Sequence, residues 1–294
     1  MTGVQSSGAA GRPAKIPTTE ELPPLLPRTP LAIIDESLTF LRTQPGTLLG
    51  VAFIVLLPLR LIAALLPGAT LRDARPDQLV DILITSLGAF DSFLGAFGLI
   101  VADSVAVFVV GAIYGRIMAR WFSGEAALAS DVLVWSIRRS PALFIIWIII
   151  HVAEVIGGSF SLGLGGILVG VLLMVTAPIF GAEDAGVRTS LSRSMNLTGP
   201  RFFACLAVFV MVAVGGQAIR FVLRTLPTIL GVSVLPIPAW IVGGVFDLLA
   251  TTVTVAFTAA SAVVLYLDLR VRKEGIDLEV AMARVFPNKG IQHG

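Results

Sequence analysis

Stretches of mixed polar and apolar residues alternate with long apolar runs along the whole chain. The clearest mixed stretch is 183–203, EDAGVRTSLSRSMNLTGPRFF. Its apolar positions recur every four residues and are Val187, Leu191 and Met195. This spacing predicts an amphipathic helix, with Glu183 and Asp184 in its first turn, where the helix dipole favours acidic groups. We expect such a helix to lie along a membrane surface with its apolar side toward the acyl chains.

The same plan occurs twice more, at 33–54 (IIDESLTFLRTQPGTLLGVAFI) and at 130–148 (SDVLVWSIRRSPALFIIWI). In each, an amphipathic stretch ends near an arginine, and a turn is expected at Pro45 or at Pro141 before an apolar run begins. The expected apolar face of the first surface helix is Leu31, Ile34, Leu38 and Leu41. The chain is therefore predicted to contain three repeats of one surface helix, a turn and two membrane spans.

Six apolar segments approach the roughly 20 residues that cross a bilayer. They are expected at about 47–66, 93–118, 141–156, 162–180, 202–219 and 240–267. Composition agrees, because 56% of the 294 residues are hydrophobic and only 14% are charged, against roughly a quarter charged in a soluble domain. The sequence predicts an all-α polytopic membrane protein. Its parts are a disordered N-terminal tail at 1–29, a six-span membrane domain at 30–279 and a C-terminal tail at 280–294.

The placement of basic residues predicts the orientation. Most of the 21 Lys and Arg residues flank one side of the bundle if both termini are cytoplasmic, as expected of a multi-pass plasma-membrane protein. The exceptions are Arg60, Arg72, Arg75, Arg220 and Arg224. The lipid bilayer is the expected partner. No nucleic-acid partner is expected, because the basic residues flank apolar runs instead of clustering on a soluble face. With one cysteine and two histidines, no metal or other cofactor is expected.

Five ionisable residues fall inside the predicted spans, where each is costly and needs a partner. They are Arg60, Asp103, His151, Glu154 and Asp247. One interpretation is a proton or cation path through the bundle. The other is structural, with Arg60 paired to an aspartate and His151 to Glu154, which share a helix face. The sequence favours the structural interpretation, because no second carboxylate lies one helical turn from Asp103 or Asp247.

A second group of charged residues surrounds the end of the last span and the third surface helix. It is a candidate docking or lipid-binding surface at the cytoplasmic face and consists of Arg188, Arg193, Tyr266, Asp268, Arg270, Arg272 and Glu274. The simpler interpretation is an interfacial tyrosine followed by i,i+4 ion pairs on a helix that leaves the membrane.

The segment 266–279, YLDLRVRKEGIDLE, carries a family resemblance. Further matching positions are Pro178, Glu183, Ser190-Leu191, Arg193-Ser194 and Phe202. Over about 30–279 the chain resembles the actinobacterial family of the glycerophosphoryl diester phosphodiesterase membrane domain. The resemblance implies a six-span membrane protein, and Arg60 and the polar insertion after the first span depart from it. The soluble metal-binding barrel of fused relatives has no counterpart here, so the resemblance implies no activity.

Function stays open between two classes. The leading hypothesis is a non-catalytic scaffold or accessory component that organises lipid, or another membrane or cytoplasmic protein, at the cytoplasmic face. The alternative is a transporter or channel for a small solute or ion that uses the intramembrane charged residues. An enzyme is not expected, because His151 has no GxSxG-like companion and the two aspartates lack the flanking motifs of an intramembrane protease.

Overall fold

The computed structural model describes residues 26–65, 90–229 and 239–275. Residues 1–25 of the predicted N-terminal tail, the polar segment after the first span and the predicted C-terminal tail lie outside the described residues. Helices account for most of the described part of the chain, and no strand occurs there. This confirms the predicted all-α fold.

Within the described ranges, six helical segments are long and apolar enough to cross a membrane. They are α2 (Pro45–Ala64), α4 (Phe90–Phe122), α5 (Ala129–Phe160), α6 with α7 (Leu164–Leu173 and Thr176–Glu183), α9 (Phe202–Ile229) and α10 (Ala239–Glu274). The shorter helices are α1 (Pro30–Thr43), α8 (Val187–Thr198) and the 3-10 turn η2 (Gly199–Arg201). The chain is an integral membrane protein whose predicted spans correspond to these segments. The three-repeat plan stays a prediction.

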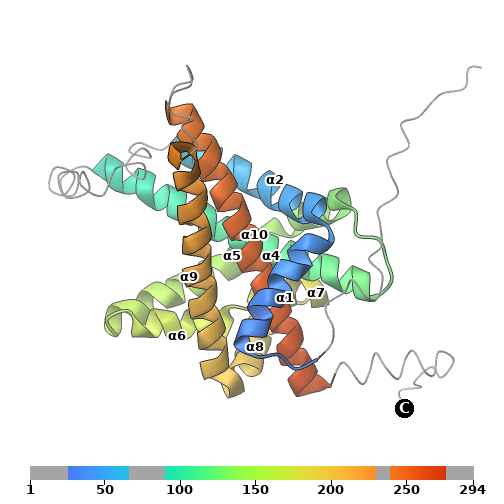
Figure 1. Ribbon diagram of the computed structural model, residues 1–294. Helices are drawn as coiled ribbons and strands as arrows, with labels where there is room; N and C mark the ends of the chain where they lie inside the picture. The colour runs from blue at the N-terminus through green and yellow to red at the C-terminus, as the bar shows by residue number, and fades with distance from the viewer. Residues whose placement is uncertain (1–25, 66–89, 230–238, 276–294) are drawn as a thin grey trace, which may run out of the picture.

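The last helix, α10, is the centre of the bundle. Of its most apolar 18 residues, 72% are buried, against 17% for α5. It packs against α9, α4, α1 and α2 (Figure 1). Beside it, Phe40 of α1 stands edge-on to Tyr114 and Trp121 of α4, and the Tyr114 hydroxyl donates to the Leu48 carbonyl at 2.6 Å. These contacts join the first, second and sixth predicted spans into one core.

Both ends of the described chain lie on the same side of the bundle. The Arg28 backbone N–H donates to Asp268 of α10 at 2.6 Å, and Arg272 donates back to the Arg28 carbonyl at 2.6 Å. Burial lowers the pKa of the Arg28 guanidinium, and the charges of Glu36 and Asp268 oppose that shift. Residue 28, which the sequence analysis placed in the N-terminal tail, thus has hydrogen-bond partners on α10, and the boundary of the tail at residue 29 stays a prediction.

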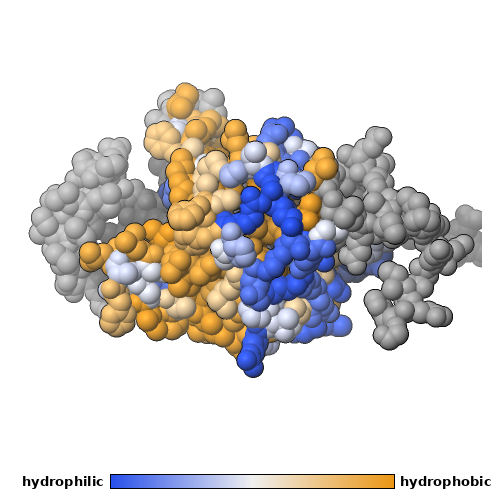
Figure 2. All heavy atoms as spheres, turned by 90° about the horizontal axis from the view of Figure 1, so that it is seen from below, coloured by the Kyte–Doolittle hydropathy of each residue, from blue (hydrophilic) through white to orange (hydrophobic). Residues whose placement is uncertain are grey.

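This side also carries the surface helices, and we call it the polar end. Figure 2, seen from below, shows hydrophilic residues gathered in one band beside a broad hydrophobic surface. Such a division is expected where a lipid-facing flank meets a water-facing end. An even number of spans places both chain ends on one side, in agreement with six.

The predicted apolar face of the first surface helix is correct at Leu41, which is buried, and wrong at Leu31, while Ile34 and Leu38 are partly buried against the core. The buried residues of α1 are Ile33, Ser37, Phe40 and Leu41, whereas Leu31 is 70% exposed. The reason is that α1 packs against α10 and α9, so the neighbouring helices and not a lipid surface decide which side is buried.

The third surface helix also differs from its prediction. It begins at Val187, so Glu183 ends α7 and Asp184 follows it with a positive φ of 49°. The acidic residues are thus not in the first turn of α8. Its fully buried side chains include Ser190, Ser194 and Thr198, while Met195 of the expected apolar face is 46% exposed.

The turn expected at Pro141 does not occur, because α5 continues through it from Ala129 to Phe160. Proline has no N–H to donate to the carbonyl four residues earlier, which is that of Ile137. The Ser140 hydroxyl donates to this carbonyl at 2.8 Å. The freed backbone group is therefore satisfied locally and the helix persists.

The fourth span is broken between α6 and α7. At the break, the Leu172 carbonyl accepts the hydroxyls of Ser194 at 2.8 Å and Thr198 at 2.9 Å. This explains the buried hydroxyls of α8, since an unpaired carbonyl inside a membrane protein is costly. The short helix α7 then packs closely on α4, where a Cβ added to Gly115 would stand 2.5 Å from the Pro178 carbonyl oxygen.

The fifth span is longer than predicted. Instead of ending near residue 219, α9 continues to Ile229 with Pro227 inside it. The extension carries Arg220 and Arg224 on a regular helix, four residues apart and therefore on one face. This geometry brings both arginines to the intramembrane site described next.

Candidate intramembrane polar site

Arg60 is the centre of a charged network that joins three predicted spans. Its Nε donates to Asp103 Oδ1 at 2.6 Å and its Nη2 to Oδ2 at 3.0 Å, a two-pronged contact from α2 to α4. Its Nη1 donates to Asp247 of α10 at 2.7 Å, and its Nη2 also reaches the Thr251 hydroxyl at 2.8 Å. The Arg60 side chain is only 10% exposed. The pairing that the sequence analysis considered thus involves both aspartates.

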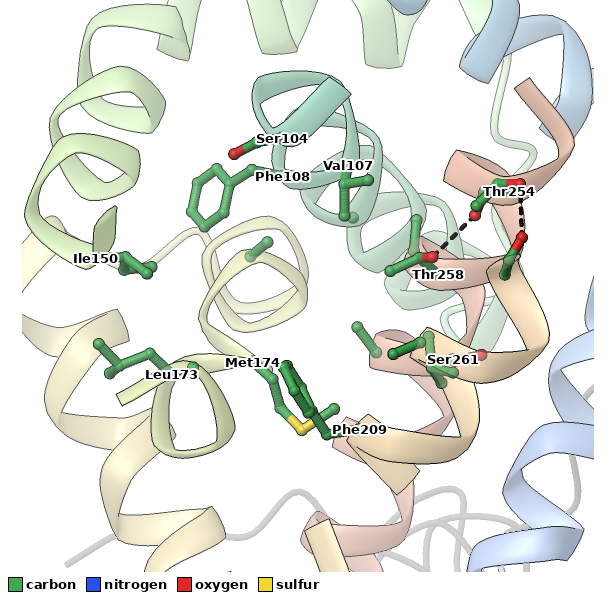
Figure 3. Close-up of a pocket in the computed structure, with 18 of the residues that line it drawn as sticks. Ser104, Val107, Phe108, Ile150, Leu173, Met174, Phe209, Thr254, Thr258 and Ser261 are labelled. Carbon is green, nitrogen blue, oxygen red and sulfur yellow. Dashed lines mark hydrogen bonds between the residues drawn. The ribbon is translucent and has the colours of Figure 1, made fainter. Parts of the chain in front are cut away.

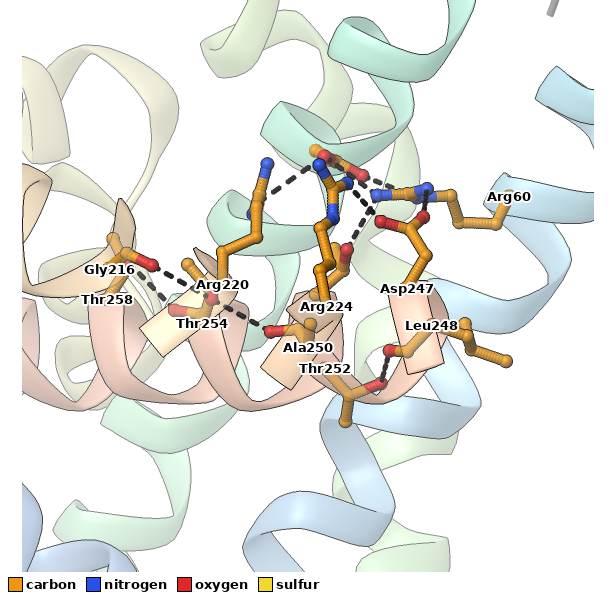
Figure 4. A network of polar contacts seen from close by, with 12 residues as sticks. Arg60, Gly216, Arg220, Arg224, Asp247, Leu248, Ala250, Thr252, Thr254 and Thr258 are labelled. Atoms are coloured by element: carbon orange, nitrogen blue, oxygen red, sulfur yellow. Dashed lines mark hydrogen bonds and ion pairs between the residues drawn. The ribbon is translucent and has the colours of Figure 1, made fainter. Parts of the chain in front are cut away.

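Two further arginines join from α9, and sequence reasoning had assigned them to an outer segment. Arg224 pairs with Asp247, and Arg220 Nη2 lies 3.6 Å from Asp103 Oδ2. Figure 4 shows the guanidinium groups of Arg60, Arg220 and Arg224 converging from two sides on this cluster. In the sequence, the i,i+4 spacing of Arg220 and Arg224 within an apolar stretch is the signal that could have placed them in this site. The network holds one more guanidinium than carboxylate.

A second polar group, around His151, joins α4 to α5. The His151 Nδ1 lies 2.9 Å from the Trp147 carbonyl, which can only accept, so this nitrogen carries the proton. His151 Nε2 and the Ser104 hydroxyl are hydrogen-bonded at 2.6 Å. The Ser104 oxygen in turn accepts the Trp147 indole N–H at 2.7 Å. The result is a closed ring of three hydrogen bonds.

Glu154 is adjacent to this ring but is not hydrogen-bonded to it. Its Oε2 lies 3.8 Å from His151 Nε2, and its side chain is 31% exposed. The structure therefore brings these two predicted residues together on α5, while Ser104 and Trp147, which complete the group, were missed. The five predicted intramembrane residues form two clusters, Arg60 with both aspartates and His151 with Glu154.

A cavity of about 400 Å³ opens between α4, α5, α6, α9 and α10. Its wall includes apolar side chains such as Phe108, Ile150, Leu173 and Met174 (Figure 3). Polar groups interrupt this wall and include Ser104, His151, Glu154, Gln217, Arg220 and Thr254. Arg220 connects the cavity to the charged network. A volume of 300–1,000 Å³ with a few convergent polar groups is typical of a small-molecule site.

A second cavity of about 460 Å³ lies between α2, α4 and α5. It shares Phe108 with the first cavity, and Trp147 lines it on one side of the hydrogen-bonded ring. Its lining is otherwise almost entirely apolar, with Ser136 and Ser140 as the exceptions. The first cavity is therefore the stronger candidate for a specific ligand. Among the described side chains, no three His, Cys, Asp or Glu residues cluster as metal ligands would.

The predicted docking residues mostly contact one another at the polar end. Arg193 pairs with Glu183 at 2.6 Å and with Glu274 at 2.7 Å, and Arg270 also pairs with Glu274 at 2.8 Å. The Tyr266 hydroxyl donates to Glu183 at 2.7 Å. These contacts tie α7, α8 and α10 together, so they contribute to the fold whatever else they do.

The remaining predicted docking residues are Asp268, Arg272 and Arg188, and only the first two pair with each other. Arg272 pairs with Asp268 at 2.9 Å, and Asp268 is buried. Arg188 is exposed and makes no ion pair within the part of the chain that the structure describes. Sequence reasoning had not singled out Glu183 as a partner of Tyr266 and Arg193, because 83 residues separate Glu183 from Tyr266.

Comparisons with known proteins add no family to this geometry. No family model matches the chain, and neither a curated protein nor a solved structure matches it. The resemblance drawn from residues 266–279 therefore stays a prediction, and function has to be argued from the site.

Proposed function

We propose that the protein is a non-catalytic membrane protein that binds a small solute within the bilayer, as transporters and channels do. The observation that carries this proposal is the first cavity, whose mixed lining of Ser104, His151, Glu154 and Arg220 lies on helices long and apolar enough to cross a membrane. Polar groups in that location are expensive unless they serve a ligand or one another. Cytoplasmic termini and a plasma-membrane location belong to the same proposal and rest on the distribution of basic residues.

The charged network has a supporting role in this proposal. Arg60, Asp103 and Asp247 are saturated by mutual contacts, so they hold α2, α4 and α10 together next to the cavity. The solute-binding groups are then those that face the open space. This differs from a path that runs through the aspartates themselves.

The test begins with protein purified from its own membranes in a mild detergent. Native mass spectrometry should detect a small-molecule adduct on the wild-type chain. Ala213→Trp, which fills the first cavity from α9, should lose the adduct and any flux in liposomes. Val105→Trp is the matched control, because Val105 lines the second cavity. Equal loss from both variants, or retention by Ala213→Trp, would argue against the proposal.

A scaffold is the second candidate, favoured by the hydrophilic band at the polar end (Figure 2). Arg138 and Arg188 are exposed there on α5 and α8, and neither makes an ion pair with another described residue. Replacing both by glutamate should release a bound protein partner without unfolding the bundle. Arg193, Arg270 and Arg272 are unsuitable for this test, because each holds an internal ion pair. A stoichiometric partner protein that co-purifies with the wild type in place of a small molecule would favour the scaffold.

A further inference from the structure

Glu154 is a carboxylate inside a predicted span that accepts no hydrogen bond from any described residue. Its nearest ion-pair partner, His151 Nε2, is 3.8 Å away and is already hydrogen-bonded to the Ser104 hydroxyl. The other ring nitrogen of His151 donates to a backbone carbonyl, so both ring nitrogens have partners other than Glu154. A carboxylate left without a donor in this environment is costly. It therefore points to a ligand that brings positive charge.

The surroundings of this carboxylate suit an ammonium group. A Cβ added to Gly170 of α6 would stand 3.1 Å from Glu154 Oε1 and 3.6 Å from Phe209 Cε2. The carboxylate and the aromatic ring thus both lie next to this glycine, and all three residues line the first cavity. A cationic nitrogen is attracted both by a carboxylate and by an aromatic ring.

Hydroxyl groups on α10 also favour a positively charged ligand. Thr254, Thr258 and Ser261 each donate to the carbonyl four residues earlier on the helix, at 2.8–2.9 Å. A hydroxyl has a single proton, and here that proton is already donated to a backbone carbonyl. These oxygens can therefore only accept hydrogen bonds from a ligand. Arg220, the cationic group of the lining, lies 3.6 Å from Asp103, which Arg60 also contacts. An anionic ligand would have to compete with Asp103 and approach Glu154.

We propose that Glu154, Gly170 and Phe209 form the binding site for the nitrogen of a small organic ammonium cation, whose apolar part lies against Leu173 and Met174. This inference rests on the proposed function, because it names the solute class of the same cavity. The volume of about 400 Å³ accommodates an aryl or alkyl group beside the nitrogen.

The test measures binding of benzyltrimethylammonium to the full chain in nanodiscs by calorimetry, with empty nanodiscs as reference. Neopentylbenzene, in which carbon replaces the charged nitrogen, is the neutral comparison, and phenylmethanesulfonate is the anionic one. The cation should bind and saturate, at least about tenfold more tightly than either comparison. Glu154→Gln should lose about tenfold in affinity and Phe209→Leu several-fold. Glu125→Gln, the same change at an exposed surface carboxylate, should bind as the wild type does.

Gly170→Ala tests the site without changing any charge and serves if Glu154→Gln does not fold. Its methyl group would crowd the Glu154 carboxylate at 3.1 Å and contact the Phe209 ring at 3.6 Å, so the carboxylate would have to shift and affinity for the cation should fall about tenfold. Equal binding of the neutral compound and the cation, or unchanged binding by Glu154→Gln, would overturn the ammonium assignment. If Ala213→Trp abolishes binding in that case, the cavity remains the solute site. If Ala213→Trp binds as the wild type does, the proposed function fails as well.

Discussion

At the scale of single residues, charge in the spans is stabilised by mutual pairing. The Arg60 side chain contacts two aspartates and one threonine from two other helices. Removing one partner of a buried pair costs more than the pair itself contributes, because an uncompensated charge remains in a medium of low polarity. The network is therefore expected to control stability first and function second.

Asp103→Asn should lower the stability of the folded protein by about 3 kcal/mol, because it leaves Arg60 and Arg220 facing a neutral amide. Thermal unfolding followed by circular dichroism in detergent measures the change. Asp131→Asn is the control, since Asp131 is half exposed and pairs with Arg120 at 3.5 Å, and surface pairs contribute at most about 1 kcal/mol. Equal losses from both variants would mean that Asp103 is solvated in the native protein.

At the scale of helices, close backbone packing determines where α7 lies. Two glycines make it possible, Gly115 on α4 and Gly181 on α7, and each faces backbone atoms of the other helix. In lipid, small residues at a helix interface allow this approach, because dispersion contacts and not water exclusion hold the helices together. The position of α7 in turn places Glu183 beside Tyr266 of α10.

Gly181→Ala should destabilise the protein by more than about 3 kcal/mol, because the new Cβ would overlap the Ala112 carbonyl oxygen and force the helices apart. Gly50→Ala is the matched control. A Cβ there meets nothing within 4 Å, and alanine stabilises a helix by about 1 kcal/mol over glycine. The yield of folded protein and its melting temperature report the difference. A Gly181→Ala variant as stable as Gly50→Ala would mean that α4 and α7 are not packed this closely.

At the scale of the whole molecule, the arrangement of the helices determines which segments lie on the same side of the bundle. Residues 26–29 and the last turns of α10 meet at the polar end, together with α8. The turn between α5 and α6 lies far from α8 (Figure 1). With cytoplasmic termini, that turn faces outward.

This topology predicts opposite labelling of two introduced cysteines by a membrane-impermeant maleimide. Leu162→Cys, at a fully exposed position in the α5–α6 turn, should react in intact cells. Arg188→Cys should react only after the membrane is permeabilised. The native Cys205 is fully buried and gives the unreactive background. Labelling of both positions from outside, or the reverse pattern, would contradict the proposed orientation.

The chemistry of the site was only partly predictable from the sequence. His151 and Glu154 lie three residues apart, so their common helix face follows from helical geometry alone. Ser104 and Trp147 complete the group around His151, but Ser104 comes from α4, 47 residues before His151. Glu183 joins the predicted docking residues across an even longer separation. No local pattern records such pairings.

The sequence by itself determined the all-α class and the number of spans. In hydrocarbon each backbone N–H and C=O must be satisfied within its own segment, so an apolar run of about 20 residues has to be a helix. Only the tertiary structure decided which helices meet. Asp103 and Asp247 reach the same arginine from 43 and 187 residues away, and α1 leaves Leu31 of its predicted apolar face exposed. The physical reason is that lipid and neighbouring helices are equally apolar, so periodicity shows that a face avoids water but not what covers it.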